Sequence, residues 1–218
     1  MTKRLLHNAQ LIDPEAGTIT HADIRIENGL ITQVSQSPLS ANPNEHSVDC
    51  HNKYLTPGII DIGVKVCEPG ERHKESFKSA GLAAAAGGIT TMVTRPDTTP
   101  AIDSPETLEF IARRANQATP VNVIPMAALT KGRNGREMSE IGFLMDAGAI
   151  AFTDCDHVVS NPKVFARALS YACALGALVI AHPQEPTLSK GAAATSGKFA
   201  SLRGLPAVSA MAERMGLD

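Results

Sequence analysis

Apolar and polar residues alternate in the first part of the chain, with the period of two that marks a half-buried β-strand. Two such runs cover Leu5–Ile12 and Ala22–Val34. The second run breaks at Asn28-Gly29, which predicts a type I′ hairpin turn because both residues tolerate a positive φ. Ser35–Ser47 is polar and contains proline, so we expect a loop there. Residues 1–54 are therefore predicted to form a small β-rich segment.

From residue 55 onward, short apolar runs alternate with longer stretches of helical character. Predicted strands cover Leu55–Val66, Ile89–Thr94, Val121–Ala127, Ala149–Thr153 and Ala177–His182. Predicted helices cover Glu75–Ala86, Ser104–Gln117, Glu137–Ala147, Asn161–Leu175 and Pro206–Met215, and Gln184–Gly204 is predicted to be a loop. The second and fourth helices open with Ser-Pro and Asn-Pro, in which a capping side chain precedes a proline at the first helical position.

This order of elements predicts an α/β fold with a parallel sheet. Strands that alternate with helices pair in parallel, because each crossover helix returns the chain to the same edge of the sheet. Short and almost wholly apolar strands suit a sheet that is buried on both faces. A doubly wound open sheet and a (β/α)8 barrel both satisfy the pattern, which does not choose between them.

Composition narrows the classes of function. Twenty Lys and Arg residues stand against 22 Asp and Glu residues, a formal charge of -2 that offers no electrostatic footprint for nucleic acid or an anionic membrane. No stretch approaches the roughly 20 apolar residues that a membrane span needs. The four cysteines are widely spaced, without a CxxC pair that would suggest a zinc ribbon or a disulfide framework. We expect a cytoplasmic protein with reduced thiols.

Local motifs favour the barrel. Their order along the chain is Thr56-Pro-Gly-Ile-Ile-Asp61, Glu68-Pro-Gly70, Lys74-Glu75, Ala83–Thr91, Pro96-Asp-Thr98, Thr130-Lys-Gly132, Ala149–Asp154, His182 and Gly204-Leu-Pro206. In this order they resemble the dihydroorotase family of the amidohydrolase superfamily over essentially the whole chain. The resemblance implies that the β-rich segment 1–54 belongs to a composite sandwich that flanks a barrel. It also implies a (β/α)8 barrel with one or two zinc ions at the carboxyl ends of its strands, where barrel enzymes hold their active sites. Such an ion acidifies a bound water that attacks an amide carbon.

The first barrel strand departs from the family pattern at its metal ligands. In the family this strand ends Asp-x-His-x-His-x-Arg-Glu-Pro-Gly, and period-two spacing points both histidines inward to the metal. Here Gly63 and Lys65 stand at the two histidine positions. Glycine brings no ligand atom, and a lysine ammonium is repelled by a divalent metal unless it is deprotonated or carbamylated. The resemblance therefore predicts that this chain does not hydrolyse dihydroorotate by itself.

The substrate-binding positions have changed as well. Cys67 stands where the family has an arginine for the substrate carboxylate, a charge-assisted contact of about 1.5–3 kcal/mol. Asp97 stands where the family has an asparagine, and its charge would repel that carboxylate. Arg95 would compensate only if its side chain pointed inward. No residue is assigned a catalytic role.

Two metal-ligand positions of the family are retained. Asp154, after the fourth barrel strand, matches a bridging aspartate, and His182, after the fifth, matches a ligand histidine. Two protein ligands are fewer than the three of usual catalytic zinc sites, so we expect hydrogen bonds or water in place of zinc. A rebuilt site that recruits Cys67, Cys155 and His157 is the less favoured alternative. Lys131, which follows the third strand, is expected to position a loop.

Residues 55–218 are too few for a complete barrel, which typically has about 250 residues, and they allow about five β/α units. A further metal histidine and the catalytic aspartate of the family are expected beyond this stretch. The sequence leaves open a truncated reading frame, a cleaved fragment, and a fragment completed by another chain.

Three functional interpretations follow. The first is a non-catalytic subunit, like the inactive dihydroorotase homologues that act as scaffolds for aspartate carbamoyltransferase. The expected partners of this chain are therefore aspartate carbamoyltransferase, further copies of itself, or both. The second is an active zinc-dependent cyclic-amide hydrolase, either a dihydroorotase or a relative similar to allantoinase or hydantoinase. The third is a non-functional fragment. The missing histidine pair favours the first and third over the second.

Overall fold

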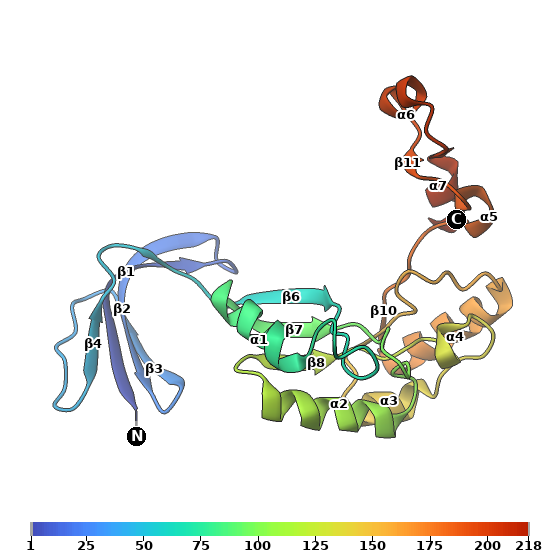
Figure 1. Cartoon of the computed structure of the whole chain (residues 1–218). Coiled ribbons are helices and arrows are strands. Elements are labelled where there is room, and N and C mark those ends of the chain that lie inside the picture. The colour runs from blue at the N-terminus through green and yellow to red at the C-terminus, as the bar shows by residue number, and fades with distance from the viewer. Residues whose placement is uncertain (1, 218) are drawn as a thin grey trace. The chain divides into compact units, whose positions relative to one another are not determined.

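The structure of the chain is a computed structural model that describes residues 2–217. The chain divides into two compact units, Met1–Gly58 and Ile59–Asp218. Each unit has its own sheet and its own buried side chains. In Figure 1 the first unit is blue and the second runs from cyan to red.

The first unit is a five-stranded sheet in the order β3-β2-β1-β4, with β5 paired to β1. Its strands are β1 (Lys3–Asp13), β2 (Thr18–Glu27), β3 (Leu30–Ser35), β4 (His46–Asp49) and β5 (Tyr54–Leu55). Asn28 and Gly29, with φ of 52° and 82°, turn the chain from β2 into antiparallel β3, so the predicted hairpin is confirmed.

Two sequence predictions near this unit are wrong at their ends. The loop predicted for Ser35–Ser47 is too long, because β4 begins at His46 and pairs in parallel with β1. The barrel strand predicted from Leu55 begins at Ile59 instead, because Leu55 pairs with Leu11 of β1. Both short strands depend on partners more than forty residues away in sequence. Local patterning does not carry that information.

The second unit is built from parallel strands that follow one another in chain order. β6 (Ile59–Val64), β7 (Ile89–Thr94) and β8 (Asn122–Pro125) form one sheet, and β9 (Ala151–Phe152) pairs with β10 (Leu178–Val179). A parallel bridge between Ala127 and Phe152 links the two sheets. The repeated β-then-α order predicted from the sequence is thus confirmed. Among the described residues β6 pairs only with β7 and β10 only with β9, so the series of strands is not closed.

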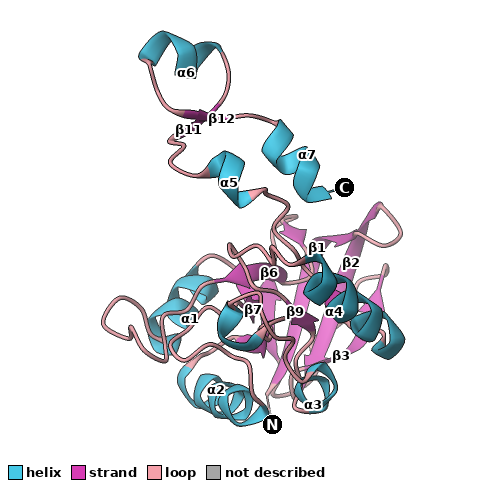
Figure 2. Ribbon diagram, turned by 90° about the vertical axis from the view of Figure 1, so that its right-hand side faces the viewer, coloured by secondary structure: helices cyan, strands magenta, loops and turns pink. Residues whose placement is uncertain are grey.

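Helices connect these strands, as Figure 2 shows. They are α1 (Phe77–Ala86), α2 (Pro105–Ala118), α3 (Ile141–Asp146) and α4 (Pro162–Leu175), with a short 3-10 helix η1 at Lys131–Arg133. Ser104 caps α2 and Asn161 caps α4, each followed by a proline, as the sequence predicts. α3 is shorter than the predicted Glu137–Ala147, because residues 137–139 pair with the segment after β8 instead. The carbonyl oxygen of Glu137 accepts from the N–H of Lys131, and the N–H of Ser139 donates to the carbonyl oxygen of Leu129.

The main core of the second unit lies between its strands and its helices. It includes Met92 of β7, Phe152 of β9, Leu108 and Ile111 of α2, and Leu144 of α3, all 1% exposed or less. Full burial of each such side chain contributes about 1.5–3 kcal/mol. Packing of this face against the helices holds the strands in place, and the polar residues that follow them lie at their carboxyl ends.

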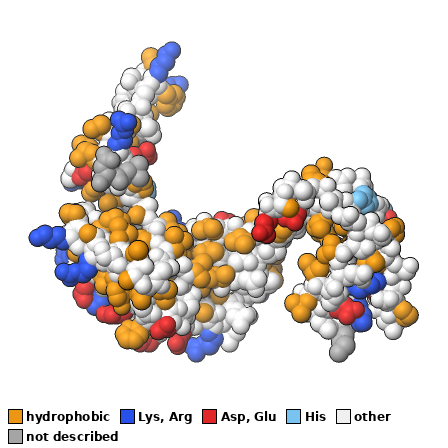
Figure 3. All heavy atoms as spheres, turned by 180° about the vertical axis from the view of Figure 1, so that it is seen from behind, with side chains coloured by type: hydrophobic (Ala, Val, Ile, Leu, Met, Phe, Trp, Pro, Cys, Tyr) orange, Lys and Arg blue, Asp and Glu red, His pale blue; other side chains and the backbone are white. Residues whose placement is uncertain are grey.

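The opposite face of the same strands is less covered. Val93, Met126 and Ala151 form a small buried cluster there. Ile60 and Ile62 pair with Thr91 and Val93 of β7, and are 61% and 67% exposed. Residues opposite each other in a parallel pair share a face, so these isoleucines belong to this second face. Exposed apolar side chains occur on other elements too, and Figure 3 shows many of them on one side of the molecule.

The last part of the chain contains more regular structure than the sequence predicts. The stretch Gln184–Gly204, predicted to be a loop, holds α5 (Pro186–Ser189), β11 (Ala194–Thr195) and α6 (Lys198–Arg203). The helix predicted from Pro206 begins at Met211 as α7 (Met211–Leu217), because β12 (Ala207–Val208) first pairs with β11. The Glu185 carboxylate caps α5 by accepting from the backbone N–H of Leu188 at 2.6 Å.

None of the helices within residues 2–217 combines the length and the apolar character that crossing a membrane requires.

Candidate functional site

The carboxyl end of β6 carries an irregular backbone at Gly63. Gly63 has φ of +93°, and the pairing of β6 with β7 shifts register between Ile62 and Val64. A β-bulge with a positive φ at this point is a conformation that glycine adopts easily and that other residues resist. The first of the two histidine positions is therefore occupied by a residue that the local backbone itself favours.

Lys65, at the second histidine position, forms an ion pair. Its Nζ lies 3.0 Å from Oδ2 of Asp97, whose side chain is only 3% exposed, whereas that of Lys65 is 52% exposed. The hydrogen bond and the negative charge of Asp97 raise the pKa of Lys65. The amine is thus held in its charged form, which repels a divalent metal. It also opposes carbamylation, since that reaction requires the neutral amine.

Arg95 joins the same ion pair from β7. Its Nη2 donates to Oδ2 of Asp97 at 2.9 Å and lies 3.4 Å from Oδ1 of Asp156. Arg133 reaches Asp156 from η1, with Nη2 to Oδ1 at 2.9 Å. We call Lys65, Arg95, Asp97, Arg133 and Asp156 the strand-end ion network. Since Arg95 is already paired with two carboxylates, the structure does not bear out its use as a substitute for the missing substrate arginine.

Asp154 is buried, at 4% exposure, and its carboxylate is already hydrogen-bonded. Oδ1 accepts from the backbone N–H of Thr130 at 3.0 Å, and Oδ2 accepts from the hydroxyl of the same residue. The carbonyl oxygen of Asp154 accepts from Nε and Nη2 of Arg133 at 3.2 and 3.1 Å. The residue predicted as a bridging metal ligand here ties the loop after β8 to the loop after β9.

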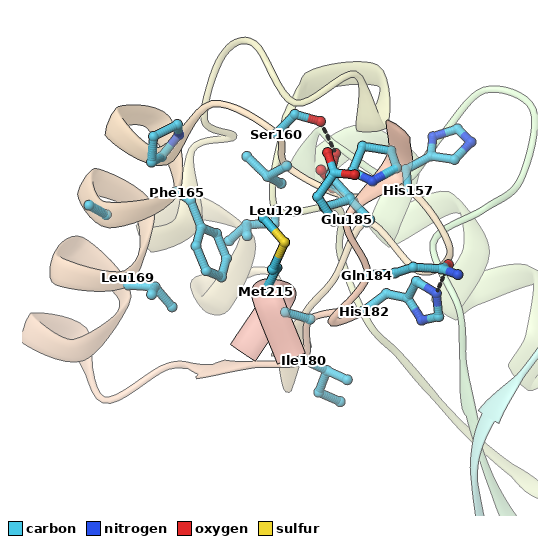
Figure 4. A pocket seen from close by; sticks show the side chains of 18 residues that line it. Leu129, His157, Ser160, Phe165, Leu169, Ile180, His182, Gln184, Glu185 and Met215 are labelled. Atoms are coloured by element: carbon cyan, nitrogen blue, oxygen red, sulfur yellow. Dashed lines mark hydrogen bonds between the residues drawn. The ribbon is translucent and has the colours of Figure 1, made fainter. Parts of the chain in front are cut away.

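His182 follows β10 and is exposed. Its Nε2 lies 2.9 Å from Oε1 of Gln184, an interaction that Figure 4 shows as a dashed line. His182 and Asp154 line the same pocket, which has a volume of about 500 Å³. Figure 4 shows that Phe165, Leu169 and Met215 lie to one side of this pocket and the imidazole of His182 to the other. The structure thus brings the two retained ligand positions to one cavity, although both already have protein partners.

The residues proposed for a rebuilt metal site do not gather into one. Burial and the nearby charge of Asp97 raise the pKa of Cys155, although Arg95 and Arg133 oppose the shift. Nδ1 of His157 lies 2.9 Å from the carbonyl oxygen of Arg133. Cys67 is half-buried, and its carbonyl oxygen accepts from the N–H of Glu71 at 2.8 Å.

The donor set of the described chain therefore does not fit a zinc centre. Nowhere in residues 2–217 do three or more His, Cys, Asp or Glu side chains come close enough together to hold a metal ion. A catalytic zinc needs three protein ligands. At the expected position the strand offers an ammonium group and a glycine, and the retained carboxylate accepts two hydrogen bonds from Thr130.

The Glu68-Pro-Gly70 motif has a structural part in shaping the same end of the sheet. The buried Glu68 carboxylate accepts from the N–H of Phe77 at 2.9 Å and from Nε of Arg114 at 2.8 Å. Burial alone would raise the pKa of Glu68, but these two bonds, together with the positive charges of Arg114 and Arg72, outweigh it and lower the pKa. A Cβ at Gly70 would lie 2.6 Å from the carbonyl oxygen of Thr99. Only glycine permits this approach of the loops after β6 and β7.

Sequence reasoning missed three residues that organise the site. They are Thr130, which holds Asp154, and Arg133 and Asp156, which extend the ion network. The Thr-Lys-Gly motif indicates this loop, but its most conspicuous side chain, Lys131, pairs through Nζ with Glu137 at the surface. The partners lie more than twenty residues apart in sequence, so no spacing rule finds them.

Fold and site together define the class of protein. Parallel β/α units that carry their polar residues at the carboxyl ends of successive strands are the architecture of barrel enzymes. The L-hydantoinase (dihydropyrimidinase) from Arthrobacter aurescens has a similar structure, with a TM-score of 0.76 and 21% identity, over 86% of this chain and 42% of that protein. The fold is thus a partial barrel of the amidohydrolase type, as the sequence predicts.

The sequence comparisons identify the family. The family model described as dihydro-orotase-like matches residues 52–215, so the chain belongs to the dihydroorotase-like family. The dihydroorotase of Syntrophus aciditrophicus (strain SB) is 35% identical over 211 residues, which are 97% of this chain and 50% of the relative. That of Geobacillus kaustophilus (strain HTA426) is 38% identical over 196 residues, 88% of this chain and 46% of the relative. The chain spans about half the length of these curated relatives.

Proposed function

We propose that this chain is a dihydroorotase-like protein of pyrimidine biosynthesis that does not itself hydrolyse dihydroorotate. Its function would be that of a structural or regulatory partner of aspartate carbamoyltransferase. Membership of the family supports the pathway. The partner rests on the resemblance of the lost histidine pair to inactive family members that serve as scaffolds.

One observation carries the proposal of inactivity. The Lys65 ammonium is paired with the nearly buried Asp97 at 3.0 Å, where the family motif places a metal-binding imidazole. A positive charge at that point disfavours a divalent ion by direct Coulomb repulsion, and in a protein environment this is stronger than in water. Without the metal, the site lacks the group that lowers the pKa of the attacking water in zinc hydrolases.

Turnover and metal content test this proposal directly. The protein would be purified with zinc in the medium, and its metal content and its hydrolysis of dihydroorotate would be measured beside the Geobacillus kaustophilus dihydroorotase. We expect far less than one zinc per chain and no hydrolysis above the rate in buffer. Stoichiometric zinc together with turnover by the unaided polypeptide would refute the proposal.

Association with aspartate carbamoyltransferase is a separate test. The two proteins would be mixed and analysed by sedimentation velocity, with the carbamoyltransferase alone and the present protein alone as controls. We expect a new and faster boundary that contains both chains. Unchanged sedimentation of each protein at micromolar concentrations would refute the scaffold role. Sedimentation of the present protein alone also reports whether it forms a homo-oligomer.

The alternative is an active zinc-dependent cyclic-amide hydrolase, a dihydroorotase or a relative similar to allantoinase or hydantoinase. The observation that favours it is that Asp154 and His182 line one pocket of about 500 Å³, a size that suits a small cyclic amide. This reading requires further metal ligands from outside the described residues. Assays with dihydroorotate, allantoin and hydantoin, each with added zinc, separate it from the first proposal.

A further inference from the structure

The strand-end ion network lies where the family resemblance implies a metal centre. A metal centre in a barrel joins ligands from several strands, and in doing so it holds the strand ends together. In this chain the network makes links of the same kind. Lys65 follows β6, Arg95 and Asp97 follow β7, Arg133 belongs to η1 after β8, and Asp156 follows β9.

We propose that the strand-end ion network replaces the metal centre as the structural link between the ends of β6, β7, β8 and β9. The proposal deepens the proposed function, because it states what holds the site together in the absence of a metal. It concerns stability and local order, whereas the proposed function concerns turnover and partners. Either can therefore fail without the other.

The burial of Asp97 makes the network more than a set of surface ion pairs. Its side chain is 3% exposed and faces two cations, Lys65 at 3.0 Å and Arg95 at 2.9 Å. A carboxylate removed from water depends on such partners, and loss of one of them leaves a buried charge undercompensated. Surface pairs, by contrast, contribute little, because water already solvates both groups.

Direct side-chain contacts also connect the network to the segments after β8 and β9. The Arg133 side chain is 12% exposed and donates both to Oδ1 of Asp156 at 2.9 Å and to the carbonyl oxygen of Asp154. Arg95 reaches the same Asp156 oxygen at 3.4 Å. A single carboxylate thus receives one guanidinium from β7 and another from η1. The chain of contacts runs unbroken from β6 to the loop after β9.

The chain offers a closely matched pair of lysines for the test. Lys65 is 52% exposed and pairs with Asp97, which is 3% exposed. Lys74 is 56% exposed and pairs with Glu71, which is 45% exposed. The two lysines therefore differ mainly in the burial of the carboxylate that each one neutralises. Lys65→Met and Lys74→Met, made in the full chain, isolate that difference.

We expect Lys65→Met to lower the melting temperature by about 2–8 °C and Lys74→Met by less than about 2 °C. Lys65→Arg should restore most of the loss, and adding Asp97→Asn to Lys65→Met should restore part of it, since the carboxylate that needs a cation is gone. Equal effects of the two Met variants would overturn the proposal.

A measurement on the unmodified protein keeps the test decisive if the variants do not fold. Melting would be recorded with excess EDTA and, separately, with excess zinc. We expect a shift below about 1 °C in each case, because no metal holds the strand ends. Hydrogen exchange should show residues 95–98 and 153–156 to be protected with EDTA present. Loss of that protection or a lower melting temperature with EDTA would show that a metal is the link, and would overturn the inference.

Discussion

Restoring the histidine motif is the most direct perturbation of the site. In the double variant Gly63→His and Lys65→His, the two side chains expected of a family member return to β6. A simple view of the site as an enzyme that has lost two ligands predicts that zinc binding returns with them. The structure predicts the opposite, and the size of the effect can be worked out from two local terms.

The first term is backbone strain at Gly63. Its φ of +93° lies in a region that side-chain-bearing residues rarely adopt, and such strain costs about 1–3 kcal/mol. The second term is loss of the Lys65 ammonium from Asp97. Because Lys65 is 52% exposed and Arg95 remains in place, we discount the cost of a fully buried pair to about 1–2 kcal/mol. Together the two terms destabilise the fold by about 2–5 kcal/mol.

That sum corresponds to a fall in melting temperature of about 4–20 °C for a protein of this size. Zinc should not reverse it, because both oxygens of Asp154 accept hydrogen bonds from Thr130 and Nε2 of His182 lies 2.9 Å from Oε1 of Gln184. Calorimetric melting with and without zinc, combined with metal analysis, measures both quantities. A variant that binds one zinc per chain and melts above the parent protein would refute the reasoning.

Three further predictions concern the residues around the site. Gly70→Ala should lower the free energy of unfolding in urea by about 3 kcal/mol or more, because its Cβ would lie 2.6 Å from the carbonyl oxygen of Thr99. Gly17→Ala, also at positive φ but with nothing within 4 Å, should cost only about 1 kcal/mol, and equal losses would contradict the prediction. Thr130→Val should cost about 2–4 kcal/mol, because loss of the hydroxyl leaves Oδ2 of Asp154 and the N–H of Gly135 without a partner, while the backbone bond to Oδ1 remains. The exposed Thr32→Val serves as its control, and a loss no larger than that of the control would count against the assigned bonds. Folding lowers the pKa of Glu68, so its carboxylate stabilises the folded protein above the ordinary value of 4.5 and loses this contribution as the pH falls through the folded pKa. The difference in unfolding free energy between the parent and Glu68→Gln should therefore shrink below pH 4.5. A difference that grows on acidification would contradict the lowered pKa.

Much of the second unit follows from local sequence. Ser104-Pro105 and Asn161-Pro162 place helix starts correctly, because capping and the fixed φ of proline act within one turn. Ile89–Thr94 is predicted to the residue, since its apolar, β-branched run is bounded by Gly88. The strands β4, β5, β11 and β12 are missed or misplaced, because each is defined by a partner strand elsewhere in the chain and not by its own periodicity.

In the candidate site, too, some features follow from local sequence and others only from strand pairing. The identities of Gly63 and Lys65 are visible in the sequence and are enough to predict that an ordinary metal site is absent from the first barrel strand. The partner of Lys65 is not visible there. Asp97 lies thirty-two positions further on, and only the parallel pairing of β6 with β7 brings the two side chains to 3.0 Å.

The sequence by itself therefore determines the family, the order of strands and helices, and the loss of two imidazoles, because each depends on short stretches of neighbouring residues. What the tertiary structure decides is how the remaining charges are compensated. Arg95 and Asp97 follow β7, Arg133 follows β8 and Asp156 follows β9, and they meet because parallel strands present their carboxyl ends on one side of the sheet. The cost of leaving a carboxylate such as Asp97 buried without a cation depends on that meeting, and no local pattern records it.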